Sequence, residues 1–198
     1  MIATTWKTVA GQGSADVALI LPGSGYTAQA PLLYWCARLL EGAGWQVRVA
    51  TWGEGGGADV TPVEFVERSV EDGFSAAEPS TPGAGRRLVV AKSFGTLAAP
   101  WAGREGVRGV WLTPILTDEP VAQALAAATR DDLVVGGEAD DLWRPERLEG
   151  TDARVVTVPG GDHGLLVPGG WRESLAAQQR VYDAVAEHLG VTSSAAAP

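Results

Sequence analysis

Short apolar runs closed by Gly, Pro, Asp or Ser alternate along the chain with longer stretches whose apolar residues have helical spacing. The runs predict buried strands at Val17–Leu21, Gln46–Thr51, Leu88–Ala91, Gly109–Leu112, Leu133–Val135 and Arg154–Val158. The longer stretches predict helices at Gln29–Leu40, Pro62–Ala77, Phe94–Gly103, Pro120–Ala128 and Trp171–Leu189. Parallel neighbours need crossover connections, so strands that are apolar on both faces and joined by helices indicate a covered parallel sheet. We therefore predict a doubly wound α/β fold, with helices on both faces of a mostly parallel sheet of about six to seven strands.

Length and composition set the expected domain organisation. The chain has 198 residues, of which 45% are hydrophobic and 20% charged, so one sizeable core can form and a disordered chain is excluded. We expect a single domain over residues 1–190. Residues 191–198 are mostly small and end in Ala-Ala-Ala-Pro, which predicts a flexible tail.

Charge and cysteine usage narrow the classes of partner. The net charge of −9 and the lack of a basic stretch argue against nucleic acid and anionic membranes. No apolar run approaches the ~20 residues that span a bilayer, and Met1–Gly11 does not resemble a secretory signal. Cys36 has no second thiol for a disulfide or a metal site. We expect a cytoplasmic protein that is a monomer or homodimer, acts on a small molecule and needs no cofactor or metal.

A serine follows the strand Leu88–Ala91 directly, at the point where a helix is predicted to begin. In Lys92-Ser93-Phe94-Gly95, the small residues Ala91 and Gly95 flank Ser93 at the spacing of a nucleophile elbow. Such a turn presents the hydroxyl above the sheet and leaves the N–H of Phe94 free for a developing oxyanion. Ser93 could also be a simple helix N-cap. We expect Lys92 to pair with a surface carboxylate, since side chains next to the elbow diverge from it.

A serine nucleophile needs a base, and the chain has two histidines, His163 and His188. His163 lies in a Gly-rich loop after the strand Arg154–Val158, where a carboxyl-end loop of the sheet is expected. His188 falls in the last turn of a predicted helix, where an imidazole favours the helix dipole and needs no further role. We therefore predict that His163 is the base; its alternative is a simple turn residue.

The third member of such a site is a carboxylate that orients the imidazole. The loop after Leu133–Val135 contains Asp140 and Asp141, and Asp140 is the favoured candidate. Both could also be turn formers. Asp162 adjoins His163 in the chain and is expected to shape its turn instead.

Further loops and aromatic residues are predicted to complete the site. The loop after Val17–Leu21 can offer a second oxyanion donor, from the N–H of Ser24 or Gly25. The predicted substrate-binding side chains are Tyr26, Trp111, Trp143 and Trp171. The alternative for the tryptophans is core packing. The loop Glu54–Gly57 could border the site.

In chain order the candidates are Ser93, Asp140 and His163, each behind a different strand. In this order of residues and in three of its turns, the chain resembles the α/β-hydrolase superfamily over roughly residues 15–189. The turns are Pro22-Gly23-Ser24-Gly25, Lys92-Ser93-Phe94-Gly95 and Asp162-His163-Gly164-Leu165. It looks most like its small, lidless bacterial members, including dienelactone-hydrolase-like enzymes. Pro22 stands where many relatives have His before Gly, and Ala91 replaces the first glycine of the elbow.

The resemblance implies a serine hydrolase of the esterase or thioesterase type without a cap domain. We expect it to cleave a carboxylic ester, lactone or thioester of a small, uncharged, partly apolar molecule through a Ser-His-Asp triad and an acyl-enzyme. The alternative is a catalytically silent scaffold of the same fold that binds a protein or a small ligand.

Overall fold

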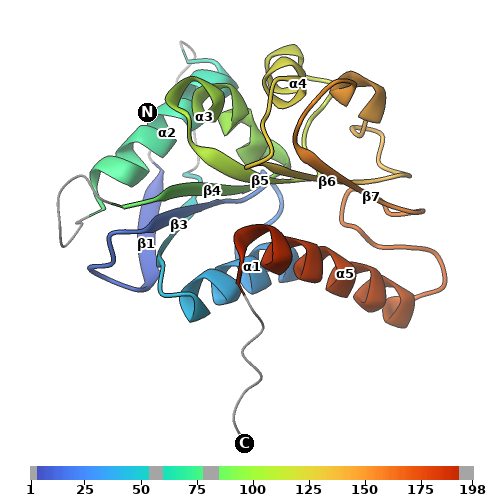
Figure 1. Ribbon diagram of the computed structural model, residues 1–198, viewed down its shortest axis with the longest axis horizontal. Coiled ribbons are helices and arrows are strands. Elements are labelled where there is room, and N and C mark those ends of the chain that lie inside the picture. The colour runs from blue at the N-terminus through green and yellow to red at the C-terminus, as the bar shows by residue number, and fades with distance from the viewer. Residues whose placement is uncertain (1–3, 54–59, 78–84, 192–198) are drawn as a thin grey trace, which may run out of the picture.

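A seven-stranded sheet forms the centre of the computed structural model, which describes residues 4–53, 60–77 and 85–191 (Figure 1). In chain order the strands are β1 (Thr5–Ala10), β2 (Val17–Leu21), β3 (Gln46–Thr51), β4 (Arg87–Lys92), β5 (Arg108–Leu112), β6 (Leu133–Gly137) and β7 (Arg154–Val158). They lie in the order β1-β3-β2-β4-β5-β6-β7. All neighbours are parallel except β1, which pairs antiparallel with β3. The predicted doubly wound, mostly parallel sheet is confirmed.

Helices cover both faces of this sheet (Figure 1). They are α1 (Pro31–Gly42), α2 (Pro62–Ser75), α3 (Ala99–Glu105), α4 (Glu119–Ala126) and α5 (Trp171–Leu189), with the 3-10 helices η1 (Ser93–Ala98) and η2 (Pro145–Leu148). α1 and α5 pack on one face, and α2, α3 and α4 pack on the other (Figure 1). Because side chains alternate along a strand, Leu88 and Val90 of β4 enter the apolar cluster under α1 and α5. Val89 and Ala91 enter the opposite cluster.

The strand order reverses at β2, which has β3 on one side and β4 on the other. The connection after β2 leads into α1 on one face, while the connection after β4 leads into η1 and α3 on the other. Connections that part in this way leave a crevice at the carboxyl ends of the two strands, where ligands bind in open α/β sheets. The fold therefore places the predicted site beside the end of β4.

Two local elements differ from the sequence-based expectation. The strand β1 was not predicted, although its residues alternate between half-buried and exposed as an edge strand should. The helix predicted at Phe94–Gly103 is broken into η1 and α3. Ser93 has a φ of +50°, which is incompatible with the start of a regular α-helix, and the chain recovers helical geometry only after the tight turn.

The segment between β5 and β6, residues 113–132, holds only the short helix α4. The expected absence of a cap domain at this position is therefore what the structure shows. The predicted flexible tail falls on Val191, which is described, and on residues 192–198, which lie outside the described part. The predicted bordering loop, Glu54–Gly57, also lies outside it.

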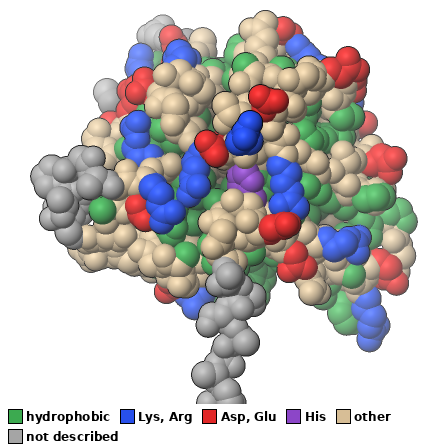
Figure 2. All heavy atoms as spheres, in the orientation of Figure 1, with side chains coloured by type: hydrophobic (Ala, Val, Ile, Leu, Met, Phe, Trp, Pro, Cys, Tyr) green, Lys and Arg blue, Asp and Glu red, His purple; other side chains and the backbone are tan. Residues whose placement is uncertain are grey.

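Acidic and basic side chains are interspersed over the face seen in Figure 2, with apolar side chains between them. The excess of negative charge is thus not gathered into one region of that face. Within the described ranges, no helix is both long and apolar enough to cross a membrane.

Candidate active site

Three side chains from three loops form one hydrogen-bonded line at the carboxyl edge of the sheet. Nε2 of His163 lies 2.8 Å from Oγ of Ser93, and Nδ1 of His163 lies 2.7 Å from Oδ2 of Asp140. Ser93 follows β4, Asp140 follows β6 and His163 follows β7. The structure therefore brings together the three predicted triad residues, which are far apart in the sequence.

The backbone at Ser93 has the strained geometry of a nucleophile elbow. With its φ of +50°, Ser93 is one of three non-glycine residues in the described part of the chain that have a positive φ. A β-carbon on Gly95 would lie 2.4 Å from the carbonyl oxygen of Leu21, so the turn can press against β2 only with glycine there. The sharp turn thus depends on Gly95 and leaves the Ser93 side chain part-exposed.

The carboxylate of Asp140 is held firmly in place. Its side chain is 2% exposed, and its Oδ1 accepts a hydrogen bond of 2.9 Å from the N–H of Leu142. Burial raises the pKa of Asp140, but the hydrogen bonds from His163 and Leu142 and the charge of Lys92 outweigh it, so the pKa stays below its usual value. Asp141 is exposed and is not the residue against the imidazole.

The loop that carries His163 lies directly on the end of β6. A β-carbon on Gly137 would lie 2.2 Å from the carbonyl oxygen of Gly161, so only glycine allows this approach. The N–H of Ala139 donates to that same carbonyl over 2.8 Å, which ties the Asp140 loop to the His163 loop. Asp162 shapes the turn, as expected, because its Oδ1 accepts from the N–H groups of Gly164 and Leu166.

The predicted oxyanion donors lie in two loops on the Ser93 side. Phe94 is in the first turn of η1, where backbone N–H groups have no partner within the helix. Ser24 and Gly25 occupy the exposed corner of a turn closed by the bridge between Gly23 and Tyr26. In this loop Gly23 lies against Ser93, because a β-carbon there would be 3.3 Å from that of Ser93. Sequence reasoning did not single out Gly23 for this close approach.

Tyr26 has its hydroxyl turned toward the start of α1. The Oη atom accepts a hydrogen bond of 2.9 Å from the N–H of Leu32, so this hydroxyl caps the helix. Tyr26 is one of the residues that line a cavity of about 450 Å³, formed by the 22–29 loop and by residues 49–52 at the end of β3. Tyr26 therefore lies at a cavity that the loop of Ser24 and Gly25 also lines.

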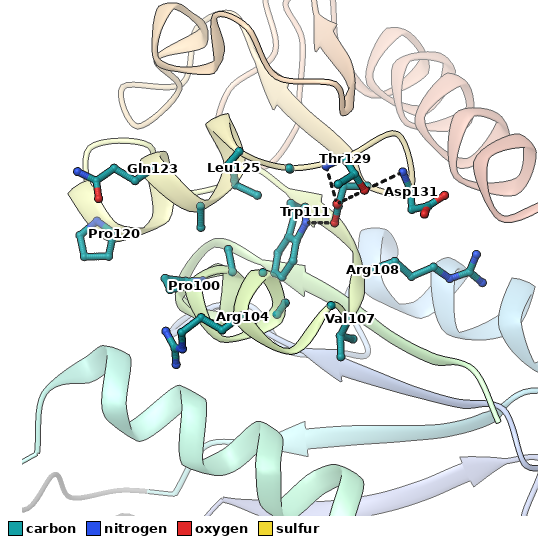
Figure 3. Close-up of a pocket in the computed structure, with 18 residues that line it drawn as sticks. Pro100, Arg104, Val107, Arg108, Trp111, Pro120, Gln123, Leu125, Thr129 and Asp131 are labelled. Carbon is teal, nitrogen blue, oxygen red and sulfur yellow. Dashed lines mark hydrogen bonds between the residues drawn. The ribbon is translucent and has the colours of Figure 1, made fainter. Parts of the chain in front are cut away.

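Two of the predicted substrate-binding tryptophans are buried elsewhere, and those predictions are wrong. The ring of Trp111 folds back over Gly109, away from the carboxyl end of β5, and its Nε1 donates to Asp132 over 3.1 Å. It lies between α3 and α4, beside a separate cavity of about 670 Å³ (Figure 3). Trp143 is 4% exposed because its ring fills the space over Gly136.

Trp171 is 63% exposed at the first position of α5, where the guanidinium of Arg172 lies over its ring. Among the described residues, no hydrogen bond or ring contact joins Trp171 to the surroundings of Ser93. A substrate contact of Trp171 stays a prediction.

An aromatic cluster that the sequence analysis missed lies next to Ser93. It consists of Trp52, Phe65 and Phe94, all partly buried. The ring of Trp52 makes edge contacts with both phenylalanines, with centroids 5.6 Å apart in each case. Its Nε1 donates to the carbonyl of Pro22 over 3.0 Å, which fixes the cluster to the loop after β2. The clue in the sequence was the position of Trp52, directly after a predicted strand.

The prediction for Lys92 is also wrong, because this side chain is buried and forms no ion pair with a carboxylate of the described residues. It is 2% exposed, and its Nζ donates to the carbonyl oxygen of His163 over 3.0 Å. Leu88, Val90 and Lys92 share one face of β4, so strand alternation directs Lys92 into the layer under α1 and α5.

The remaining candidate residues lie apart from the hydrogen-bonded line. His188 is near the end of α5, and its Nε2 lies 3.1 Å from the carbonyl oxygen of Asp131. Cys36 is fully buried in α1, and burial raises the pKa of its thiol to about 12. Within the described ranges, no three His, Cys, Asp or Glu side chains are grouped closely enough to hold a metal ion.

Comparisons with known proteins agree with this geometry at the level of the fold. By sequence, no family model and no curated protein matches the chain. By structure, a serine hydrolase without a lid from Xanthomonas campestris matches with a TM-score of 0.61 at 16% identity, over 96% of this chain and 87% of that one. An esterase from Pyrococcus furiosus matches with a TM-score of 0.63 at 15% identity, over 96% and 86%.

A third similar structure is an α/β serine hydrolase homologue from Coxiella burnetii, with a TM-score of 0.62 at 17% identity over 95% of this chain and 91% of that one. Each match extends over nearly the whole of both chains, so no large insertion separates them. The connection between β5 and β6 is likewise too short for a cap. The chain has the α/β-hydrolase fold in its lidless form.

Proposed function

We propose that the protein is a serine hydrolase that cleaves a carboxylic ester, lactone or thioester through an acyl-enzyme. The observation that carries the proposal is the hydrogen-bonded line from Ser93 through His163 to the buried Asp140. A part-exposed hydroxyl, a base within 2.8 Å and an orienting carboxylate within 2.7 Å of that base meet the geometric demands of nucleophilic catalysis.

The first half of the reaction forms the acyl-enzyme. Asp140 accepts the Nδ1–H of His163, which leaves the Nε2 lone pair to receive the proton of the Ser93 hydroxyl. As that proton moves, Oγ of Ser93 bonds to the substrate carbonyl carbon. The N–H of Phe94, with one from Ser24 or Gly25, stabilises the negative charge on the carbonyl oxygen. The imidazolium then protonates the leaving oxygen or sulfur, and the bond to that atom breaks.

The second half releases the acid. Water donates a proton to Nε2 of His163 while its oxygen attacks the acyl carbon. The tetrahedral intermediate uses the same N–H donors as before, and its collapse returns the proton to Oγ of Ser93. The enzyme is regenerated without net loss or gain of protons.

The surroundings of Ser93 support a small, uncharged and partly apolar substrate. The aromatic cluster of Trp52, Phe65 and Phe94 offers apolar surface on one side of the nucleophile. Asp141 and Asp162 are exposed on the loops that carry the acid and the base, and such carboxylates disfavour an anionic substrate.

A fluorophosphonate probe tests the reaction class. The wild-type protein should be labelled covalently at Ser93, because the probe reacts with an activated serine. Ser93→Ala should abolish labelling and lower turnover by ~10⁴-fold or more. Ser14→Ala, which removes a serine away from the site, is the matched control and should be labelled like the wild type. A folded wild-type protein that is not labelled would contradict the proposal and favour a silent scaffold.

A panel of p-nitrophenyl esters and acyl thioesters tests the substrate class. We expect kcat/KM to be higher for a neutral butyrate or benzoate than for a hemisuccinate of similar size, because the carboxylates at this edge repel the added charge. Equal or higher kcat/KM for the anionic ester would contradict this part of the proposal and leave the reaction class standing.

A further inference from the structure

Lys92, the residue immediately before the proposed nucleophile, places its ammonium group in the protein interior, where the loss of hydration disfavours a charge. Its side chain is 2% exposed and ends beneath the loops of the site. An ammonium group that loses its water must be compensated by protein partners. The partners of this group therefore indicate what it does in the fold.

The ammonium group contacts two loops other than its own. Its Nζ donates to the backbone carbonyl of His163 over 3.0 Å. It also lies 4.6 Å from the centre of the Tyr26 ring, within the range of a cation–π interaction. Since Tyr26 belongs to the loop that carries Ser24 and Gly25, one side chain joins the elbow, the His163 loop and that second loop.

Two consecutive residues, Lys92 and Ser93, bind the backbone and the side chain of His163. Ser93 meets its ring at Nε2 over 2.8 Å, and Lys92 meets its backbone carbonyl over 3.0 Å. The charge of Lys92 is also attracted to Asp140 and Asp162, from the loops after β6 and β7. The cation thus interacts with a residue from each of the other loops that supply a residue to the proposed reaction.

We propose that protonated Lys92 is a positioning residue, which holds the His163 loop and the Tyr26 loop in register with the Ser93 elbow. This inference rests on the proposed hydrolase function and adds a role for a side chain that does not touch the substrate. Small displacements of a base from its nucleophile lower rates by up to ~10²-fold, so such a tether has a measurable effect.

The charge of Lys92 is sensitive to moderately alkaline pH. Burial lowers the pKa of Lys92 to about 8, although the charges of Asp140 and Asp162 oppose this shift. Tyr26, whose ring faces the ammonium, and Cys36 of α1 and Tyr182 of α5 are titratable groups in the same apolar cluster, and burial raises the pKa of each, which favours their neutral forms. A neutral Lys92 amine can still donate to the carbonyl but loses its attraction to the ring and to the carboxylates.

The rate of fluorophosphonate labelling between pH 6 and 10 tests the inference. In the wild type the rate should fall as the pH rises through about 8. In Lys92→Met the rate at pH 7 should be ~10- to 100-fold lower and should lack this fall, because the charge is absent at every pH. Lys92→Gln keeps an N–H donor without a charge and should resemble Lys92→Met. Lys7→Met removes the exposed lysine of β1 and should behave as the wild type.

Nuclear magnetic resonance supplies a second readout that needs no variant of Lys92. The chain contains only Lys7 and Lys92, so protein with ¹³C-labelled lysine gives two ε-carbon signals, which Lys7→Met assigns. The Lys92 signal should titrate in the same pH interval as the labelling rate of the wild type. This comparison stands even where a substitution at Lys92 prevents folding.

The outcomes separate the two proposals. A folded wild type without labelling overturns the hydrolase function and, with it, the role of Lys92. Normal labelling of the wild type, together with parental rates and a parental pH profile in folded Lys92→Met, overturns only the Lys92 inference. A Lys92 signal that titrates in a pH interval different from that of the labelling rate also overturns only the Lys92 inference.

Discussion

Asp140 and Asp141 are neighbours in the chain but differ in their surroundings. Asp140 is buried with both carboxylate oxygens in hydrogen bonds, whereas Asp141 is exposed. A buried carboxylate stays charged only where donors and cations favour the charge, and the lowered pKa of Asp140 reflects such a balance. The two residues therefore offer a matched pair for testing the role of the acid.

Asp140→Asn should lower kcat by ~10⁴-fold, because an amide favours the wrong imidazole tautomer and does not stabilise the imidazolium. Asp141→Asn should retain turnover close to that of the wild type. Steady-state hydrolysis of a p-nitrophenyl ester measures both, with circular dichroism to show that each variant is folded. Equal effects of the two substitutions would contradict the assignment of Asp140.

At the scale of elements, the end of β6 packs directly against the loop that carries His163. Gly136 leaves room for the Trp143 ring, and Gly137 leaves room for the backbone of Gly161. Consecutive side chains of a strand point to opposite faces, so the two glycines serve opposite layers of the molecule. Neighbouring positions of β6 therefore determine core packing at Trp143 and the position of the His163 loop.

Gly137→Ala should therefore act on both stability and activity. Its β-carbon would lie 2.2 Å from the carbonyl oxygen of Gly161, so the His163 loop must shift. We expect unfolding free energy to fall by about 1–3 kcal/mol and kcat/KM to fall as well, measured by urea denaturation and ester hydrolysis.

Gly103→Ala is the control for this substitution. Gly103 is exposed in α3 and has open space around its missing β-carbon. Alanine there should raise the unfolding free energy by up to about 1 kcal/mol and leave activity unchanged. A Gly137→Ala variant as stable and active as the wild type would show that the loop does not depend on this close approach.

For the molecule as a whole, the pattern of apolar runs predicted the sheet and the placement of the candidate residues behind their strands. The reason is that central strands such as β2 and β4 are buried on both faces and leave unbroken apolar runs. β1 was missed because its sequence, Thr-Trp-Lys-Thr-Val-Ala, is largely polar on one face and has no apolar run, whereas the other edge strand, β7, has one in Val-Val-Thr-Val.

Side-chain direction was harder to predict than position along the chain. The tryptophans near strand ends were expected at the site, but Trp111 folds back over Gly109 and Trp143 fills the space over Gly136. The direction of such a ring depends on where a glycine leaves space in the packed core, and the spacing of residues along the chain does not reveal this. Lys92 was misjudged although strand alternation alone, read from Leu88 and Val90, would have directed it inward.

The scarcity of lysine has a practical consequence for handling the protein. Because Lys92 is enclosed by its neighbours, Lys7 is the one ε-amine open to acylating reagents. Immobilisation chemistry directed at lysine ε-amines would then attach the molecule through β1, one of the two edge strands of the sheet. In the sheet, β3 and β2 lie between that attachment strand and β4, which Ser93 follows.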